Sequence, residues 1–206
     1  MTTVGRWSPN KVRARVLDGT WASPPEELGG MVLLTPTSIA YTGTSASIAA
    51  NGSVEFTACS QLRLNGVFSA NYDNYMIVFR QTTSQSTAIE FRLSSGGADD
   101  LTANSYIWQY LQAISSTLDA GRVTSNYARV GVRGNEQRAG FTTNVYGPHL
   151  VQPTAYRSVT SDDYQNATFT DFGGTHNQST SYDGINIYPT VGNMTGLASV
   201  FGLVGA

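Results

Sequence analysis

The stretch LRLNGVFSANYDNYMIVFRQTTSQSTAIEFRL, residues 62–93, decides the predicted fold. Residues 75–79 within it are all apolar or aromatic, which predicts a strand that is buried on both faces. In residues 88–93 apolar and charged side chains alternate strictly, which is typical of a strand with one face in solvent. We expect these two strands to pair as a central β-hairpin.

Short β-like runs of this kind continue along most of the chain, at intervals of roughly 8 to 15 residues and with almost no helical periodicity. The expected strands are residues 38–41, 46–49, 53–58, 61–64, 75–81, 88–93, 105–113, 127–132, 140–146, 156–159, 167–171, 184–188 and 196–201. Turn signals between the runs are Asn51-Gly52, Asn65-Gly66, Gly96-Gly97, Gly173-Gly174 and Asp183-Gly184. The pattern predicts an all-β fold, an antiparallel β-sandwich of the jelly-roll kind.

The first 35 residues differ from the rest in composition. They lack a sustained period and are interrupted by proline, which favours an extended segment. Residues 1–17 hold four basic residues and no acidic one, while the chain as a whole has a net charge of −2. Tryptophan and arginine are typical interface anchors. The sequence therefore predicts an extended N-terminal anchoring arm, residues 1–35, ahead of a β-sandwich domain, residues 36–206. The partner-binding residues expected in the arm are Arg6, Trp7, Lys11, Arg13, Arg15 and Trp21.

The composition suits a β-rich protein of an extracellular space or of a particle. Only 13% of the residues are charged, against about 25% in ordinary soluble domains. The single cysteine, Cys59, cannot form an intramolecular disulfide and is expected to be a small buried side chain. No signal peptide and no apolar run long enough to span a membrane are visible, so synthesis in a cytoplasm is expected.

Two segments resemble small structural proteins of tailed bacteriophages, of the minor tail, tail-fibre and head-fibre type. They are NGSVEFTACSQLRLNGVFSANYDNYMIVFR, residues 51–80, and GTHNQSTSYDGINIYPTVGNMTGLASVFGL, residues 174–203. The elements that carry the resemblance are Asn65-Gly66 with Phe68, Tyr72 to Ile77, Tyr182 to Pro189, and Thr195 to Leu203. The resemblance covers about residues 50–204 and implies a β-sandwich component of a virion, often trimeric, that contacts the host surface.

Motifs of known enzyme classes are missing from the sequence. There is no G-x-S-x-G elbow, no H-E-x-x-H, no phosphate-binding loop and no G-x-G-x-x-G. The two histidines, His149 and His176, are expected to be hydrogen-bonding loop residues. The acidic pairs Asp99-Asp100 and Asp162-Asp163 do not follow a calcium-loop pattern. We therefore expect no enzyme, no metal and no cofactor.

An aromatic row at residues 106–110 is the most informative chemical feature. Because Tyr106, Trp108 and Tyr110 are spaced by two, their rings share one face if the segment is a strand. Such a row can belong to the core, form a subunit interface or stack on sugar rings. All three alternatives remain open from the sequence.

The favoured hypothesis is a non-enzymatic virion protein of a tailed bacteriophage, a minor tail or tail-fibre protein for host attachment. The arm would bind other virion proteins, and the poorly guarded sheet edges favour a homotrimer. Alternatives are a capsid decoration or head-fibre protein, and a carbohydrate-binding or polysaccharide-degrading module. A host cell-surface glycan is a possible further partner. Nucleic acid is not expected, because four basic residues on an otherwise acidic chain are too few.

Overall fold

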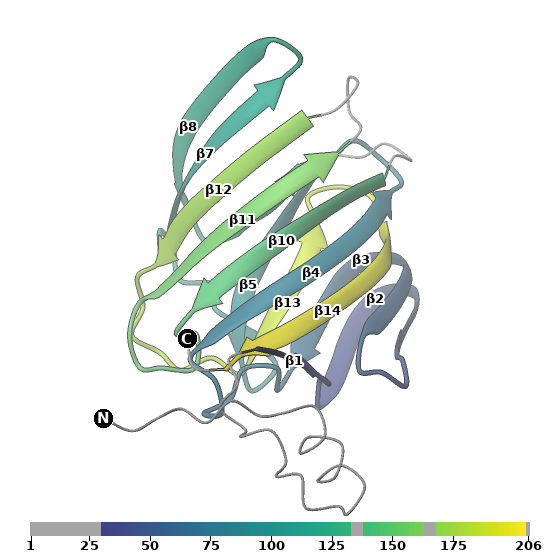
Figure 1. The fold of residues 1–206 in the computed structure, drawn as a ribbon, viewed down its shortest axis with the longest axis vertical. Helices are drawn as coiled ribbons and strands as arrows, with labels where there is room; N and C mark the ends of the chain where they lie inside the picture. The colour runs from purple at the N-terminus through teal and green to yellow at the C-terminus, as the bar shows by residue number, and fades with distance from the viewer. Residues whose placement is uncertain (1–29, 133–137, 163–167, 205–206) are drawn as a thin grey trace, which may run out of the picture.

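A computed structural model describes residues 30–132, 138–162 and 168–204 (Figure 1). The described part is all-β, and every strand pair in it is antiparallel. The strands are β1 (Met31–Leu34), β2 (Ser38–Ile48), β3 (Val54–Asn65), β4 (Asn74–Thr83), β5 (Ala88–Ser95), β6 (Ala98–Asp99), β7 (Tyr106–Ile114), β8 (Thr117–Ser125), β9 (Ala128–Val132), β10 (Arg138–Tyr146), β11 (Thr154–Asp162), β12 (Thr168–His176), β13 (Gly184–Pro189) and β14 (Met194–Leu203). The predicted all-β class is confirmed.

The strands form one continuous sheet that curls into two packed layers (Figure 1). The front layer runs β8-β7-β12-β11-β10-β4-β14, and the back layer contains β5, β13, part of β3, and β2. Strand β9 pairs with β5 and contacts β11 and β12 of the front layer. The result is an antiparallel β-sandwich, as predicted, with its core between the layers.

Strand β3 joins the two layers because it changes neighbours along its length. Residues 54–59 pair with β14, whereas residues 62–64 pair with β13. At the change, Ala58 has a φ of 48°, and the pairing with β14 shifts register. A β-bulge of this kind bends a strand and lets it leave one sheet for another. Gly196 sits opposite the bend, where a Cβ would lie 1.8 Å from the carbonyl oxygen of Arg80, so only glycine fits.

The core is an aromatic cluster that crosses from layer to layer. Phe91 of β5 packs edge-on against Tyr156 of β11, with ring centroids 5.2 Å apart. Within the front layer Phe79 stacks on Phe141 at 4.8 Å and on Phe56 at 5.1 Å. Offset and edge-to-face pairs of this geometry add to the free energy of burying each ring.

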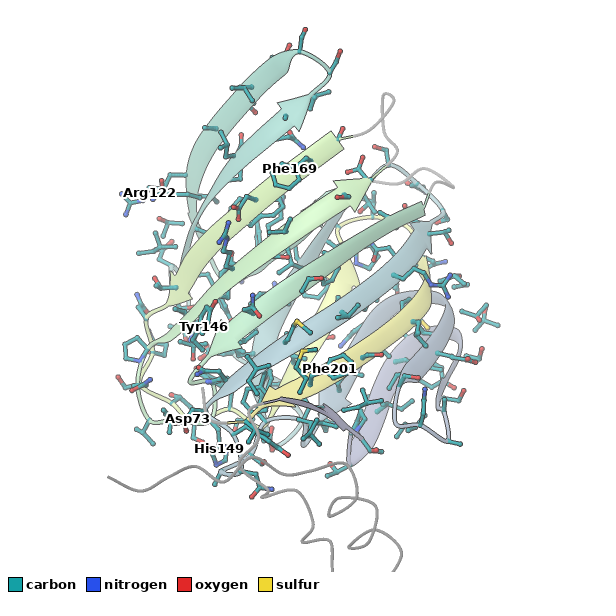
Figure 2. All side chains as sticks on the ribbon, in the orientation of Figure 1. Asp73, Arg122, Tyr146, His149, Phe169 and Phe201 are labelled. Carbon is teal, nitrogen blue, oxygen red and sulfur yellow. The ribbon has the colours of Figure 1, made fainter. Side chains whose placement is uncertain are left out.

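The strand at the centre of the opening stretch is buried on one face only. Tyr75, Ile77 and Phe79 of β4 point into the core, as expected. The prediction that the other face is also buried is wrong, because Val78 is 38% exposed and Arg80 is exposed as well. Nothing in the described structure covers the outer surface of the front layer, on which Tyr146, Phe169 and Phe201 also lie (Figure 2).

The predicted central hairpin is wrong. Strand β4 pairs with β10 and β14, whereas β5 pairs with β13, β6 and β9, so the two strands lie in opposite layers. The polar residues 84–87 cross between the layers beside residues 190–193, which make the same crossing from β13 to β14. Backbone hydrogen bonds tie the two crossings together, from Ser84 N to the carbonyl of Asn193 and from Thr190 N to that of Ala88, both 2.9 Å.

Three strands have no counterpart among the expected ones: β1, β6 and β8. Strand β8 lies at the end of the front layer, and eight of its side chains are exposed or half-buried around the small Gly121, so no apolar alternation marks it. Met31–Leu34, within the segment assigned to the arm, form β1 and pair with β14. The glycine turns predicted after β2 and β5 are confirmed, but Gly173-Gly174 lie inside β12.

Candidate functional site

The sequence-predicted site residues fall into two groups. Those of the arm, from Arg6 to Trp21, lie outside the described residues. The aromatic row lies on β7, and the strand prediction for this segment is confirmed. Its three rings all point to the inner face of the front layer, so the expected common face is confirmed too.

The inner face of β7 passes from closed to open along the strand. Tyr106 is fully buried and Trp108 is 1% exposed, whereas Tyr110 and Gln112 are partly exposed. The reason lies in what covers them. The short strand β9 lies against β11, where Ser158 Oγ donates to the carbonyl of Val130 at 2.8 Å, and its described residues end at Val132. The row is therefore core at one end and surface at the other.

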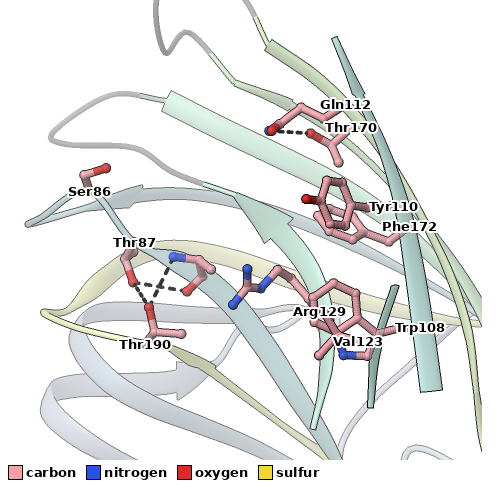
Figure 3. A pocket seen from close by; sticks show the side chains of 11 residues that line it. Ser86, Thr87, Trp108, Tyr110, Gln112, Val123, Arg129, Thr170, Phe172 and Thr190 are labelled. Carbon is pink, nitrogen blue, oxygen red and sulfur yellow. Dashed lines mark hydrogen bonds between the residues drawn. The ribbon is translucent and has the colours of Figure 1, made fainter. Parts of the chain in front are cut away.

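At the open end the two layers enclose a groove of about 450 Å³, which we call the open-end groove (Figure 3). Its walls come from β7, β8 and β12 of the front layer, and from β9 and the two layer crossings on the other side. A hollow of this volume is within the usual range for small-ligand sites. The residues that line it are Ser86, Thr87, Ala88, Trp108, Tyr110, Gln112, Val123, Arg129, Thr170, Phe172 and Thr190.

The floor of the groove holds the one charged side chain among the described residues that line it. The guanidinium of Arg129 lies over the Trp108 ring, 5.2 Å from its centroid, a cation–π geometry. Its Nη2 donates to Glu90 Oε1 at 3.1 Å. Burial raises the pKa of Glu90, and the bond from Arg129 opposes that rise. The paired charges fix Arg129 in place, while its Nε has no partner among the described residues.

Tyr110 forms one wall of the groove, and its position is set by β8. Directly opposite it in the strand pairing is Gly121, where a Cβ would lie only 2.7 Å from the Tyr110 ring. The missing side chain lets the ring lie across the neighbouring strand. The Tyr110 hydroxyl donates to Asp119 at 3.1 Å, and the ring packs against Phe172 at 6.3 Å. One ring face is thus held by protein, and Figure 3 shows Tyr110 at the side of the hollow.

The remaining walls carry neutral hydrogen-bonding groups. On the front layer Gln112 Nε2 donates to Thr170 Oγ1 at 3.0 Å (Figure 3). On the crossings the hydroxyls of Thr87 and Thr190 lie 3.0 Å apart, and Thr190 Oγ1 also accepts from the Ala88 N–H at 3.3 Å. Amides and hydroxyls therefore face one another across an aromatic floor.

A second polar cluster lies at the closed end of β7, inside the core. His176 is 1% exposed and packs on Tyr106, with ring centroids 4.2 Å apart. Its Nε2 is 3.4 Å from Asp100 Oδ2, and neither ring nitrogen has a hydrogen bond within the described residues. Burial lowers the pKa of His176, although Asp100 opposes the shift. The expectation that His176 is a hydrogen-bonding loop residue is wrong, because it ends β12 and is enclosed by aromatic rings.

The adjacent acidic pair is used for structure. Burial opposes ionisation of Asp100, but hydrogen bonds from Thr102 and Tyr182 outweigh it and lower the pKa of Asp100. Asp99 accepts from Arg63 Nη2 at 2.7 Å and from Asn186 Nδ2 at 2.6 Å. Each carboxylate is thus committed to protein donors. Within the described ranges no three side chains of the metal-binding types come together. In the same ranges no helix is long and apolar enough to cross a membrane.

Most of the groove residues were not predicted. Arg129, Gln112, Thr87 and Thr190 are scattered over four segments, and no local motif joins them. The only available signal was the alternation after Trp108, which continues through Tyr110 to Gln112 and marks the same strand face.

Comparison with known proteins finds no family and only weak structural similarity. No known protein family matches the chain, and no curated protein matches its sequence. Among solved structures, similarity is found to domain 4 of AbnA, a GH43 extracellular arabinanase from Geobacillus stearothermophilus in complex with arabinotriose. The identity is 13%, the coverage 85% of this chain and 83% of that one, and the TM-score 0.34.

A second similar structure is the C-terminal CBM6 of LamC, a marine laminarinase from Zobellia galactanivorans. It has 9% identity, covers 77% of this chain and 99% of that one, and has a TM-score of 0.19. The binding domain of botulinum neurotoxin serotype G has 9% identity, 83% and 44% coverage and a TM-score of 0.18. These scores are too low to carry a functional argument.

Proposed function

We propose that the chain is a non-enzymatic structural protein of a tailed-bacteriophage particle that takes part in host attachment. One observation carries the proposal. The sequence elements that resemble phage tail and fibre proteins, although more than 100 residues apart, lie together as one connected unit of the sandwich.

The contacts within this unit are specific. Residues 74–77 and 200–203, one part of each element, pair along β4 and β14, where Tyr75 lies opposite Gly202. The Phe68 N–H donates to the carbonyl of Asp183 at 3.1 Å, joining the end of the first element to the start of the third. The Tyr72 ring occupies the space above Gly202, where a Cβ would lie 2.5 Å from it. A shared pattern in such a unit supports a shared scaffold.

The aromatic residue Tyr75 of this unit has a structural role. Its hydroxyl accepts from the Ser69 N–H at 2.7 Å, and the carbonyls of Ser69 and Tyr72 lie at 2.7 and 2.9 Å as acceptors. One buried side chain thus fixes the whole connection between β3 and β4. The unit is a rigid support, which leaves loops, edges and the open end to carry recognition.

Purified particles of the phage that encodes the chain provide the test. We expect quantitative mass spectrometry of gradient-purified particles to find the full-length chain at the low copy number of a tail component. A copy number typical of a shell would select the capsid decoration or head-fibre alternative instead. Absence of the chain from intact particles, together with its presence in the infected-cell lysate, would contradict the proposal. The homotrimer and the anchoring by the arm remain predictions.

A further inference from the structure

We infer that the open-end groove binds a short neutral saccharide. The inference rests on the proposed function only in placing that sugar on a host surface. The chemistry of the groove carries the rest: an aromatic wall, neutral donors and acceptors on both sides, and a cation whose charge is already balanced.

Tyr110 provides the apolar contact. Sugar rings present C–H groups on one face, and these pack on aromatic rings, while their hydroxyls need hydrogen-bonding partners. Tyr110 is partly exposed, and its ring is pre-positioned by Asp119, Phe172 and the space above Gly121. A wall that is fixed before the ligand arrives loses little conformational entropy on binding.

The polar groups of the groove suit hydroxyl ligands. Gln112 uses one amide N–H on Thr170, so within the described residues its Oε1 remains free to accept. Across the groove, the exposed hydroxyls of Ser86 and Thr190 can both donate and accept. The buried Thr87 hydroxyl is already hydrogen-bonded to Ala88 and Val191. An apolar peptide in this space would leave these groups buried without partners, which is unfavourable.

The charge balance disfavours an anionic ligand. Arg129 is held by Glu90 at 3.1 Å, and Glu90 is only 6% exposed at its side chain. An acidic sugar would have to compete with a buried carboxylate for this guanidinium. A neutral hydroxyl needs no such exchange, because it does not compete for the charge of the guanidinium, and the Arg129–Glu90 ion pair stays intact.

The test uses the full-length chain on an array of neutral oligosaccharides built from hexoses, N-acetylhexosamines and deoxyhexoses, with sialylated and uronic-acid glycans alongside. The strongest neutral glycan is then titrated calorimetrically. We expect Tyr110→Ala and Gln112→Ala each to weaken its binding by about fivefold to tenfold. Tyr146→Ala is the matched control, since Tyr146 is an exposed tyrosine on the outer face of the same layer, and it should leave binding unchanged.

Three results would overturn the inference: silence of every neutral glycan, binding to acidic glycans alone, or full binding by both groove variants. A direct readout is the indole N–H resonance of Trp108, assigned with Trp108→Phe, which should shift on addition of the neutral glycan. Unfolding curves of the two groove variants serve to check that each variant is folded. If the chain is present in particles but the neutral array is silent, the inference fails and the proposed function stands. If the chain binds a neutral glycan but is absent from particles, the reverse holds.

Discussion

Tyr106 and Tyr110 are the same residue type on the same face of the same strand, yet they do different things. At the closed end Tyr106 is enclosed by Phe91 and His176, and its hydroxyl accepts from the buried Leu93 N–H at 2.8 Å. At the open end Tyr110 faces the groove and its hydroxyl reaches an exposed carboxylate. Among the described residues, the opposite layer covers Tyr106 at one end of β7 and leaves Tyr110 at the other end partly exposed.

Removal of the Tyr106 ring at the closed end should produce the largest loss of stability. Tyr106→Ala leaves a cavity in the aromatic core and an unpaired Leu93 N–H, so we expect the free energy of unfolding to fall by about 3 to 5 kcal/mol. Chemical denaturation followed by circular dichroism measures it. The matched variant Tyr110→Ala should lower it by less than about 1 kcal/mol. Equal losses in the two variants would show that the open end is as well packed as the core.

A smaller effect is expected from the hydrogen bond beside the closed end. In Tyr182→Phe the ring remains but Asp100 loses a donor, and we expect a loss of about 1.5 to 3 kcal/mol, the range for bonds to charged groups. Tyr146→Phe, at an exposed tyrosine, is the control and should change stability by less than about 0.5 kcal/mol. Denaturant midpoints of both variants measure the difference. A Tyr182→Phe protein as stable as the control would mean that Asp100 finds another donor.

The closed end should also make stability depend on pH through His176. Its pKa in the folded state is lowered below the usual 6.5 by burial, so the unfolded chain binds the proton more readily. The stabilising effect of the neutral ring is therefore complete above pH 6.5 and is lost as the pH falls below that value.

Free energies of unfolding measured between pH 7.5 and pH 5 test this expectation. Wild-type stability should fall more steeply than that of His176→Gln, in which the titrating ring is absent. Other titrating groups, such as Glu90, whose pKa is raised by burial, are common to both proteins and cancel in the comparison. Parallel curves for the two proteins would contradict the assignment to His176.

The fold class followed from local patterns, because a strand buried on one face alternates visibly in the sequence. Residues 88–93 and 106–110 are strands as predicted, and Cys59 is fully buried. The pairing of the strands could not be predicted from these local patterns, and the expected pair of β4 with β5 does not form. Residues 84–87 carry the signals of a connection, but nothing local states whether a connection turns back within a layer or crosses to the other one.

Only part of the groove could be predicted from the sequence, for a related reason. The alternation of Tyr106, Trp108 and Tyr110 gave the shared face, but not the point at which that face leaves the core. This point depends on the length of β9 and on its place in the opposite layer. Such long-range coverage has no signature near residue 108.

Strand β3, which joins the two layers, has a consequence for how the protein folds during synthesis. Its first half pairs with β14, which also pairs with β4 and β1. In the described structure β14 is therefore the strand that links β3 by backbone pairing to the front layer. During synthesis, residues 54–59 must wait for partners that emerge about 140 residues later, a separation typical of slow-folding, non-local topologies. Closure of the sandwich is therefore a late event, on the ribosome or after release. Until then, β2 is the strand that pairs with the first half of β3 around Ala58.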